Sequence, residues 1–211
     1  MSQTPDNQKP VHQTSVSQIS VKQASTKPDK KQLLIETALT LFYRQGIHAV
    51  GINEVLKVSG VAKKTLYSHF ASKDELVLAA LAARDDIFMA WLAQLLSPAQ
   101  DDAERITRLF NGLSDWFHNR VPALSPFRGC FFINTSAEFS EENAAIIAYC
   151  RDHKHKVRAL IQQHLSCQDE ALLDTVCLMK EGAIVSAFVE KDLDAAEKCV
   201  EVLMNLLHKT H

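Results

Sequence analysis

Side chains that donate hydrogen bonds are concentrated in residues 63–69, and such a segment is suited to binding a polyanion. The segment reads Lys-Lys-Thr-Leu-Tyr-Ser-His, and the apolar Leu66 and Phe70 are one helical turn apart. At 100° per residue these two side chains share the inward face of a helix, and polar side chains cover the rest. The outward residues are Lys64, Thr65, Tyr67 and Ser68. Because such side chains donate to base edges and phosphates, the pattern predicts a helix that reads double-stranded DNA.

The helices that must position this segment lie on either side of it in the sequence. Apolar spacing predicts helices over 28–45 and 52–58, a tight turn at Ser59-Gly60-Val61, and the reading helix over 63–70. Two short helices joined by a glycine-containing turn form a helix–turn–helix. A capping box, Ser72 with Glu75, begins a long fourth helix that extends to about residue 96, before Pro98.

The segments Ile52–Val55, Ser59–Phe70 and Ser72–Leu76 resemble the DNA-binding head of TetR/AcrR family transcriptional regulators. The resemblance covers about residues 28–88. It implies that Thr65 and Tyr67 contact operator DNA, and that Lys63 and Lys64 set sequence preference. It further implies backbone contacts from His69 and Lys73, the lysine binding a phosphate. Ala62 departs from the family pattern, since many members have a capping Ser or Thr there.

The remaining pattern predicts helices only, so the expected fold class is all-α. Further helices are expected at about 101–120, 128–138, 141–166, 168–190 and 194–209. We expect three domains: a disordered arm over 1–27, the head over 28–88, and a C-terminal domain over 89–211. The resemblance to the TetR/AcrR family implies that this C-terminal domain binds a small molecule and dimerises.

The charge distribution supports a polyanion partner for the head only. Residues 1–75 contain 10 Lys and Arg against 6 Asp and Glu, whereas residues 76–211 contain 13 against 19. No apolar run is long enough to span a membrane. The five cysteines are scattered and no secretory signal is present, so the expected compartment is the cytoplasm.

Aromatic side chains in the C-terminal half are candidates for the wall of an effector cavity. Most large apolar residues there must form the core, but a subset could line a cavity with a few polar groups. The predicted ligand-binding residues are Phe88, Trp91, Phe110, Trp116, Phe131, Asn134 and Glu138. The effector itself is not identified by these residues.

Chemical modification of Cys130 is an alternative to effector binding as the event that regulates the protein. It lies in the segment Gly129–Glu138, which resembles a G-C-x-x-x-N-x-x-x-E segment of some TetR-type proteins, a few of which sense electrophiles. If the segment begins a helix, Cys130 would lie in the first turn, where amide groups and Arg128 would favour a reactive thiolate. The competing interpretation is a buried, inert cysteine.

Cys150, His153 and His155 could suggest a metal site, but their spacing argues against one. On a helix the two histidines point about 200° apart, so they cannot bind one ion. The interpretation preferred here is a solvated helix rich in Lys and His, with neither metal nor cofactor.

The last two helices are expected to form a homodimer interface. Small residues near Gly182 permit close helix packing. An apolar stripe on the final helix consists of Val200, Leu203, Met204 and Leu207. In the alternative interpretation, both helices only cover the monomer core.

These features favour a DNA-binding transcriptional regulator over an enzyme. The chain lacks a glycine-rich phosphate loop, a G-x-S-x-G motif and a spaced set of metal ligands. The expected function is a homodimeric repressor released from a palindromic operator by a small molecule. The alternatives are a repressor switched through Cys130 by redox or electrophile chemistry, and an activator.

Overall fold

The fold was obtained as a computed structural model that describes residues 1, 29–139, 143–166 and 169–207. All regular structure in these ranges is helical, which confirms the expected all-α class. The elements are α1 (Lys30–Gln45), α2 (Ile52–Ser59), α3 (Lys63–His69), α4 (Lys73–Leu96), α5 (Asp102–Phe117), the short 3₁₀ helix η1 (Pro122–Leu124), α6 (Phe131–Phe139), α7 (Ala144–His164), α8 (Glu170–Val189) and α9 (Ala195–Leu207). The predicted arm, except Met1, lies outside the described residues, as does Cys167.

Local capping chemistry accounts for most of the helix starts. The Asp29 side chain accepts from the Lys31 amide at 2.9 Å, and the Ser72 hydroxyl accepts from the Glu75 amide at 3.2 Å. The Glu75 carboxylate reaches back one residue further than a standard capping box, to the Ala71 amide at 2.7 Å. As expected for alanine, Ala62 provides no side-chain cap for α3.

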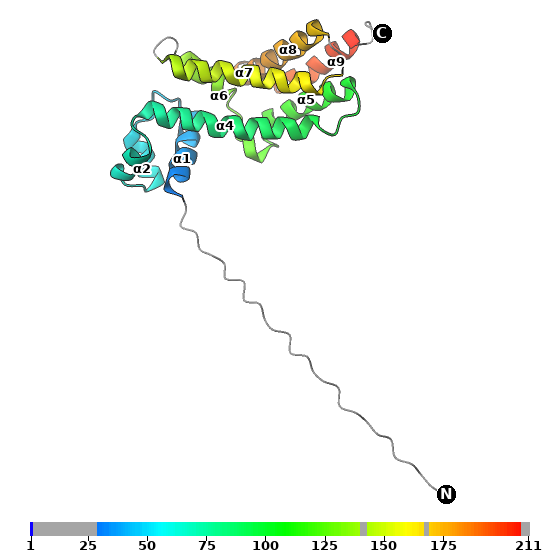
Figure 1. The fold of residues 1–211 in the computed structure, drawn as a ribbon. Helices are drawn as coiled ribbons and strands as arrows, with labels where there is room; N and C mark the ends of the chain where they lie inside the picture. Colours follow the sequence, from blue (N-terminus) through cyan, green and yellow to red (C-terminus); the bar gives the residue numbers. More distant parts are fainter. Residues whose placement is uncertain (2–28, 140–142, 167–168, 208–211) are drawn as a thin grey trace.

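Helices α1 to α3 form a compact head on the N-terminal half of α4 (Figure 1). Its core contains Leu34, Phe42, Val55 and Leu66, all 2% exposed or less. Gly60 ends α2 in the left-handed conformation, with φ +67°. This conformation suits glycine, and it turns the chain sharply so that α3 crosses back over the head core.

The body consists of α5 to α9 together with the C-terminal half of α4. Helix α7 packs along α4 and covers α6, while α5 and α8 both pack against α9 (Figure 1). Because α4 continues without a break through 24 residues, it belongs to both the head and the body. Among the described helices, none is both long and apolar enough to cross a membrane.

Helix α6 begins later than predicted. The predicted helix over 128–138 starts at Phe131, because Gly129 has a φ of +76° and breaks the helical path. Cys130 therefore lies immediately before α6, and the expectation that it lies in the first turn is wrong. The 3₁₀ turn η1, just upstream, was not predicted either.

The apolar stripe predicted on the final helix is mostly turned toward the monomer core. Leu203 is fully buried, and Val200, Met204 and Leu207 are half-buried against the same core. Within one chain the side chains of this stripe therefore pack on the core, and the dimer interface through the last two helices stays a prediction. The exposed face of α9 instead presents Val202.

Candidate DNA-reading helix and body cavity

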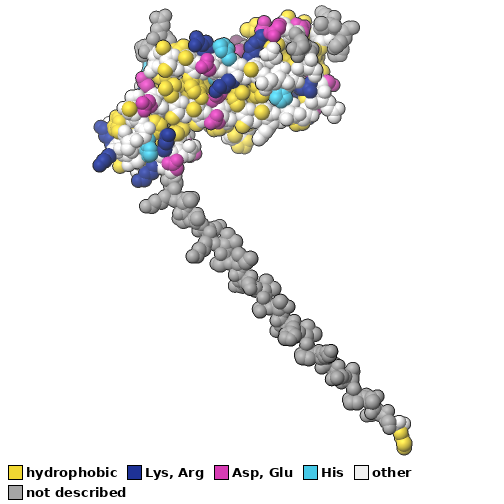
Figure 2. All heavy atoms as spheres, in the orientation of Figure 1, with side chains coloured by type: hydrophobic (Ala, Val, Ile, Leu, Met, Phe, Trp, Pro, Cys, Tyr) yellow, Lys and Arg dark blue, Asp and Glu magenta, His cyan; other side chains and the backbone are white. Residues whose placement is uncertain are grey.

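Helix α3 presents its polar residues to solvent. The exposed side chains are Lys63, Lys64, Tyr67, Ser68 and His69, while Thr65 is half-buried. Leu66 and Phe70 anchor the opposite side in the core. Figure 2 shows Lys and Arg side chains on the surface of the head, with others spread over the body. The inward and outward faces predicted from the sequence are therefore present on this helix.

One hydrogen bond and one cation–ring contact involve side chains of this face. The Ser68 hydroxyl donates to the Thr65 carbonyl at 2.7 Å, and the Lys63 ammonium lies 6.0 Å from the centre of the Tyr67 ring. Tyr67 remains 46% exposed, so its hydroxyl is accessible to a partner. Such an arrangement offers both hydrogen-bond donors and an aromatic edge to a groove.

Lys73 supports the loop between α1 and α2. Its ammonium donates to the Ile47 carbonyl at 2.6 Å and lies over the Phe42 ring. Partial burial lowers the pKa of Lys73, although the nearby Glu138 and Asp74 carboxylates oppose this shift. An ammonium has three donors, so Lys73 can contact this carbonyl and a phosphate at the same time.

Glu138 joins the body to the same loop. Its two carboxylate oxygens accept from the Ile47 amide at 2.9 Å and the His48 amide at 2.7 Å. Gly46, with φ +91°, leaves room for this approach, since a Cβ there would lie 3.4 Å from both oxygens. Glu138 thus belongs to the head–body contact, and the structure places it outside the cavity for which it was predicted.

A narrow cavity lies in the body, lined from α4, α5, α6, α7 and α8. The space in it that a water molecule can enter is about 10 Å³, within a wider gap between atoms of about 270 Å³ that includes open solvent. The lining residues are Arg84, Phe88, Trp116, Cys130, Phe131, Phe132, His153, Lys154, Lys180 and Ile184. Phe88, Trp116 and Phe131 were predicted from the sequence, and Cys130 joins them.

The other predicted cavity residues lie elsewhere. Trp91 packs on the rings of Phe88 and Trp116 behind the wall, and Phe110 is fully buried in the core. Asn134 donates to the Arg128 carbonyl at 3.1 Å. A helical wheel ranks residues by face but does not tell which buried face borders empty space, so these residues were misplaced.

Arg84 is a buried cation in the cavity wall. It is 5% exposed, and its guanidinium lies 4.8 Å from the centre of the Tyr43 ring and 5.8 Å from that of Trp116. Nη2 donates to the Leu124 carbonyl at 3.3 Å. Within the described ranges, no Asp or Glu forms an ion pair with Arg84. Its charge is therefore balanced only by rings and a carbonyl.

Two lysines share one carboxylate beside the cavity. Lys154 donates to Glu181 at 2.7 Å, and Lys180, which is 3% exposed, pairs with the other oxygen of Glu181. Burial opposes ionisation of Glu181, but the two lysines outweigh it and hold its pKa below the ordinary value. The Lys154 ammonium also lies 3.3 Å from the Cys130 sulfur.

His153 corrects the prediction of a solvated Lys- and His-rich helix. It is 2% exposed, stacks on Phe132 with ring centres 3.5 Å apart, and contacts Asp85 at 2.7 Å. Burial lowers its pKa to about 4, against the opposing effect of Asp85. Lys156 pairs with the second Asp85 oxygen at 2.6 Å, so this carboxylate is already neutralised.

The buried histidine predicts a loss of stability in mild acid. Unfolded His153 binds a proton near pH 6.5 and the folded form only near pH 4, so protonation favours unfolding between these values. Stability should be full above pH 6.5 and fall by about 2–3 kcal/mol by pH 4.5. Urea unfolding at both pH values measures this loss. His153→Gln should remove most of the difference in unfolding free energy between the two pH values. An unchanged pH dependence of stability in that variant would contradict the role given to His153.

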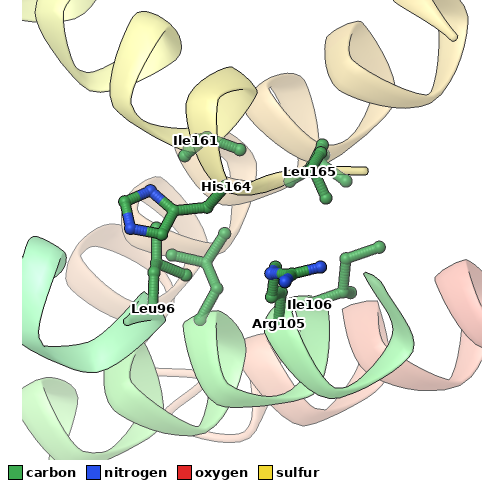
Figure 3. Close-up of a pocket in the computed structure, with 8 residues that line it drawn as sticks. Leu96, Arg105, Ile106, Ile161, His164 and Leu165 are labelled. Carbon is green, nitrogen blue, oxygen red and sulfur yellow. The ribbon is translucent and has the colours of Figure 1, made fainter. Parts of the chain in front are cut away.

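A second cavity lies at the far end of α4 (Figure 3). Its lining is mainly apolar and includes Leu96, Ile106, Ile161 and Leu165. Two polar residues also line it. Arg105 is engaged by Asp102 at 2.9 Å and by the Ala99 carbonyl at 3.2 Å, and the His164 ring contacts the Leu160 carbonyl at 2.9 Å. This second cavity therefore offers a ligand fewer available hydrogen-bond donors than the cavity beside Arg84.

Arg84, Lys180 and His153 were missed as cavity residues, although a signal was present. Each interrupts an apolar stripe at helical spacing, as Arg84 does between Ala80 and Phe88. A charged residue on a buried stripe needs a partner or a function. That rule would have identified these positions as candidates.

Known proteins resemble this chain in its head and in its fold. Residues 34–80 match the family model described as bacterial regulatory proteins, tetR family. The activator FasR of Mycolicibacterium smegmatis is 30% identical over 44% of this chain and 42% of its own length. The repressor ComR of Escherichia coli is 27% identical over 65% of this chain and 63% of its own. The chain thus spans less than two thirds of these relatives.

The structural match is broader. The TetR-family regulator SCO4454 of Streptomyces coelicolor superposes with a TM-score of 0.72 and 25% identity. That match covers 85% of this chain and 95% of SCO4454, so it includes the body as well as the head.

Proposed function

Because this chain belongs to the TetR family of transcriptional regulators, in its head sequence and in its fold, we propose that it is a homodimeric repressor. In this proposal residues 28–88 bind a palindromic operator, and residues 89–211 dimerise and bind a small molecule that releases the DNA. The observation that carries the proposal is the exposed donor face of α3, anchored by Leu66 and Phe70 in the head core. The repressor role has support from ComR by name, whereas FasR is named an activator.

An exposed apolar face supports the proposed dimer. On α8, Leu178, Val185 and Val189 follow helical spacing and are 73%, 44% and 68% exposed. Gly182 lies within the same stripe and has open space around it. Val202 on α9 adds to the apolar surface. Pairing two copies of these helices would bury this face in a two-fold four-helix interface.

The proposed release depends on two connections between cavity and head. Helix α4 carries Arg84 and Phe88 in the cavity wall and Lys73 beside the α1–α2 loop. Helix α6 begins at the cavity with Phe131 and holds the same loop through Glu138. A ligand that shifts these helices would move the head, and two heads must match the groove spacing.

A second candidate is switching through Cys130, favoured by its place in the cavity wall and its contact with Lys154. The thiolate is the nucleophilic form of a cysteine. Addition to an electrophilic double bond would form one C–S bond, and the thiol proton would end on the adjacent carbon. Operator release by such a compound that is abolished in Cys130→Ser but kept in Cys177→Ser would favour this candidate.

Selection from random duplexes tests the DNA-binding part of the proposal. We expect an enriched palindromic site and a two-fold symmetric complex of one dimer or a pair of dimers per site. Light scattering should show a dimer at micromolar concentration. Failure to enrich any site, with a folded and dimeric protein, would refute the proposed function.

Lys64 and Lys73 variants should differ in how they weaken DNA binding. Lys64→Ala should relax base preference at one or two positions, at about 1–3 kcal/mol, because Lys64 is exposed on the reading helix. Lys73→Ala should weaken all sequences alike and reduce the salt slope by about one counterion. Binding isotherms at several salt concentrations provide the measurement. Lys191→Ala on the body is the control, and identical profiles for the two head variants would show that the roles are wrongly assigned.

A further inference from the structure

We infer that the body cavity binds a small organic carboxylate with an apolar or aromatic body, and that Arg84 and Lys180 hold its charged end. This inference rests on the proposed function, since it names the chemical class of the effector. It is carried by an excess of buried positive charge on the cavity wall, next to a cluster of aromatic rings.

Among the described residues, the charges around the cavity do not balance. Arg84, Lys154 and Lys180 line it, and the carboxylate that pairs with both lysines is Glu181. One negative charge therefore faces three positive charges. A buried cation without a counter-charge is unfavourable by several kcal/mol, so a bound anion would relieve this imbalance.

The neighbouring carboxylate does not supply the missing charge. Asp85 forms its ion pair with Lys156 and accepts from His153, and His153 itself is neutral at pH 7 because burial lowers its pKa to about 4. The hydrogen bond that reaches the Cys130 sulfur comes from Lys154. Arg84 is on another helix and still has no carboxylate partner among the described residues.

Arg84 is also suited to carboxylate recognition by geometry. A guanidinium has five donors in a planar fork, and the bond from Nη2 to the Leu124 carbonyl uses one of them. The Tyr43 and Trp116 rings hold the plane in place, so little side-chain freedom is lost when a carboxylate binds.

The rest of the wall is apolar and aromatic. Phe88, Phe131, Phe132 and Ile184 surround the charged groups, and Trp116 provides an indole face. A cationic effector would be repelled by the three cations, and a neutral one would leave their charge uncompensated. A carboxylate on a small apolar body satisfies both parts of the wall.

Direct binding without DNA tests this inference. The probes are benzoate, cinnamate and hexanoate, each paired with its uncharged amide, and titration calorimetry measures affinity. At least one carboxylate should bind, and its amide should bind at least about tenfold more weakly, as expected when a charged bond is lost. Absence of binding by all three carboxylates, or equal affinity of acid and amide, would overturn the inference.

Variants locate the bound charge. Arg84→Gln and Lys180→Met should each weaken carboxylate binding at least about tenfold, whereas Arg84→Lys should retain part of it. Arg151→Gln removes an exposed cation from α7 and should leave binding unchanged. Circular dichroism confirms that each variant is folded. If a folded Arg84→Gln and a folded Lys180→Met both bind like the wild type, the charged end lies elsewhere and the inference fails.

Operator release separates this inference from the proposed function. If a carboxylate binds but leaves the operator complex intact, the anion site stands and ligand-induced release by this class fails. If the neutral amides release the operator and the carboxylates do not bind, the proposed function stands and the inference fails.

Discussion

The Leu178→Glu variant is expected to be a folded monomer that loses at least about 100-fold in operator affinity. Leu178 is 73% exposed in the single chain, so a carboxylate there should leave the fold intact. In a two-fold interface the same substitution places two like charges near each other on an apolar surface. A monomer contacts one half-site with its single head. It therefore loses the gain in affinity that comes from linking two heads, commonly a factor of about 10²–10⁴.

Light scattering and operator titration measure the two effects in the same preparation. Val185→Glu, two helical turns along the same face, should behave alike. Gln163→Glu adds the same charge to an exposed position on α7 and should remain dimeric. A Leu178→Glu protein that is still a dimer with wild-type affinity would show that α8 does not form the interface.

The Glu138→Ala variant should be destabilised by about 2–4 kcal/mol and should lose effector response. Two loop amides, of Ile47 and His48, donate to this carboxylate, and hydrogen bonds to a charged group each contribute about 1.5–3 kcal/mol. Ile47 is fully buried, so its amide has little access to replacement water. Without this contact, α6 loses both hydrogen bonds to the head loop and keeps the packing of Phe139 on the His48 ring.

Denaturant unfolding gives the stability change, and operator titration with and without effector gives the response. Glu54→Ala is the matched control, because its carboxylate also lies in the head but accepts from the exposed Gln45 side chain. We expect that control to change stability by less than about 1 kcal/mol. Full effector response in a folded Glu138→Ala protein would show that the Glu138 hydrogen bonds do not transmit release.

The head could be predicted from the sequence because its information is local. The i, i+4 spacing of Leu66 and Phe70 determines which face of α3 is outward, and Ser72 with Glu75 marks the start of α4. Helical periodicity acts over a few residues, so these features do not depend on distant parts of the chain. The start of α6 was less accurate, because Gly129 adopts a φ of +76° where a continued helix was predicted, and it lies against Phe188 of the distant α8.

The set of residues that line the body cavity depends on the tertiary structure. Arg84, Lys154 and Lys180 lie up to 96 positions apart in sequence, and only the packing of α4, α7 and α8 brings them to one wall. His153 was predicted to belong to a solvated helix rich in Lys and His, yet it lies on the buried stripe of α7. Sequence alone determined which faces are apolar. Which of those faces meet, and where they leave charges unpaired beside empty space, depends on how side chains from separate helices fill a shared volume.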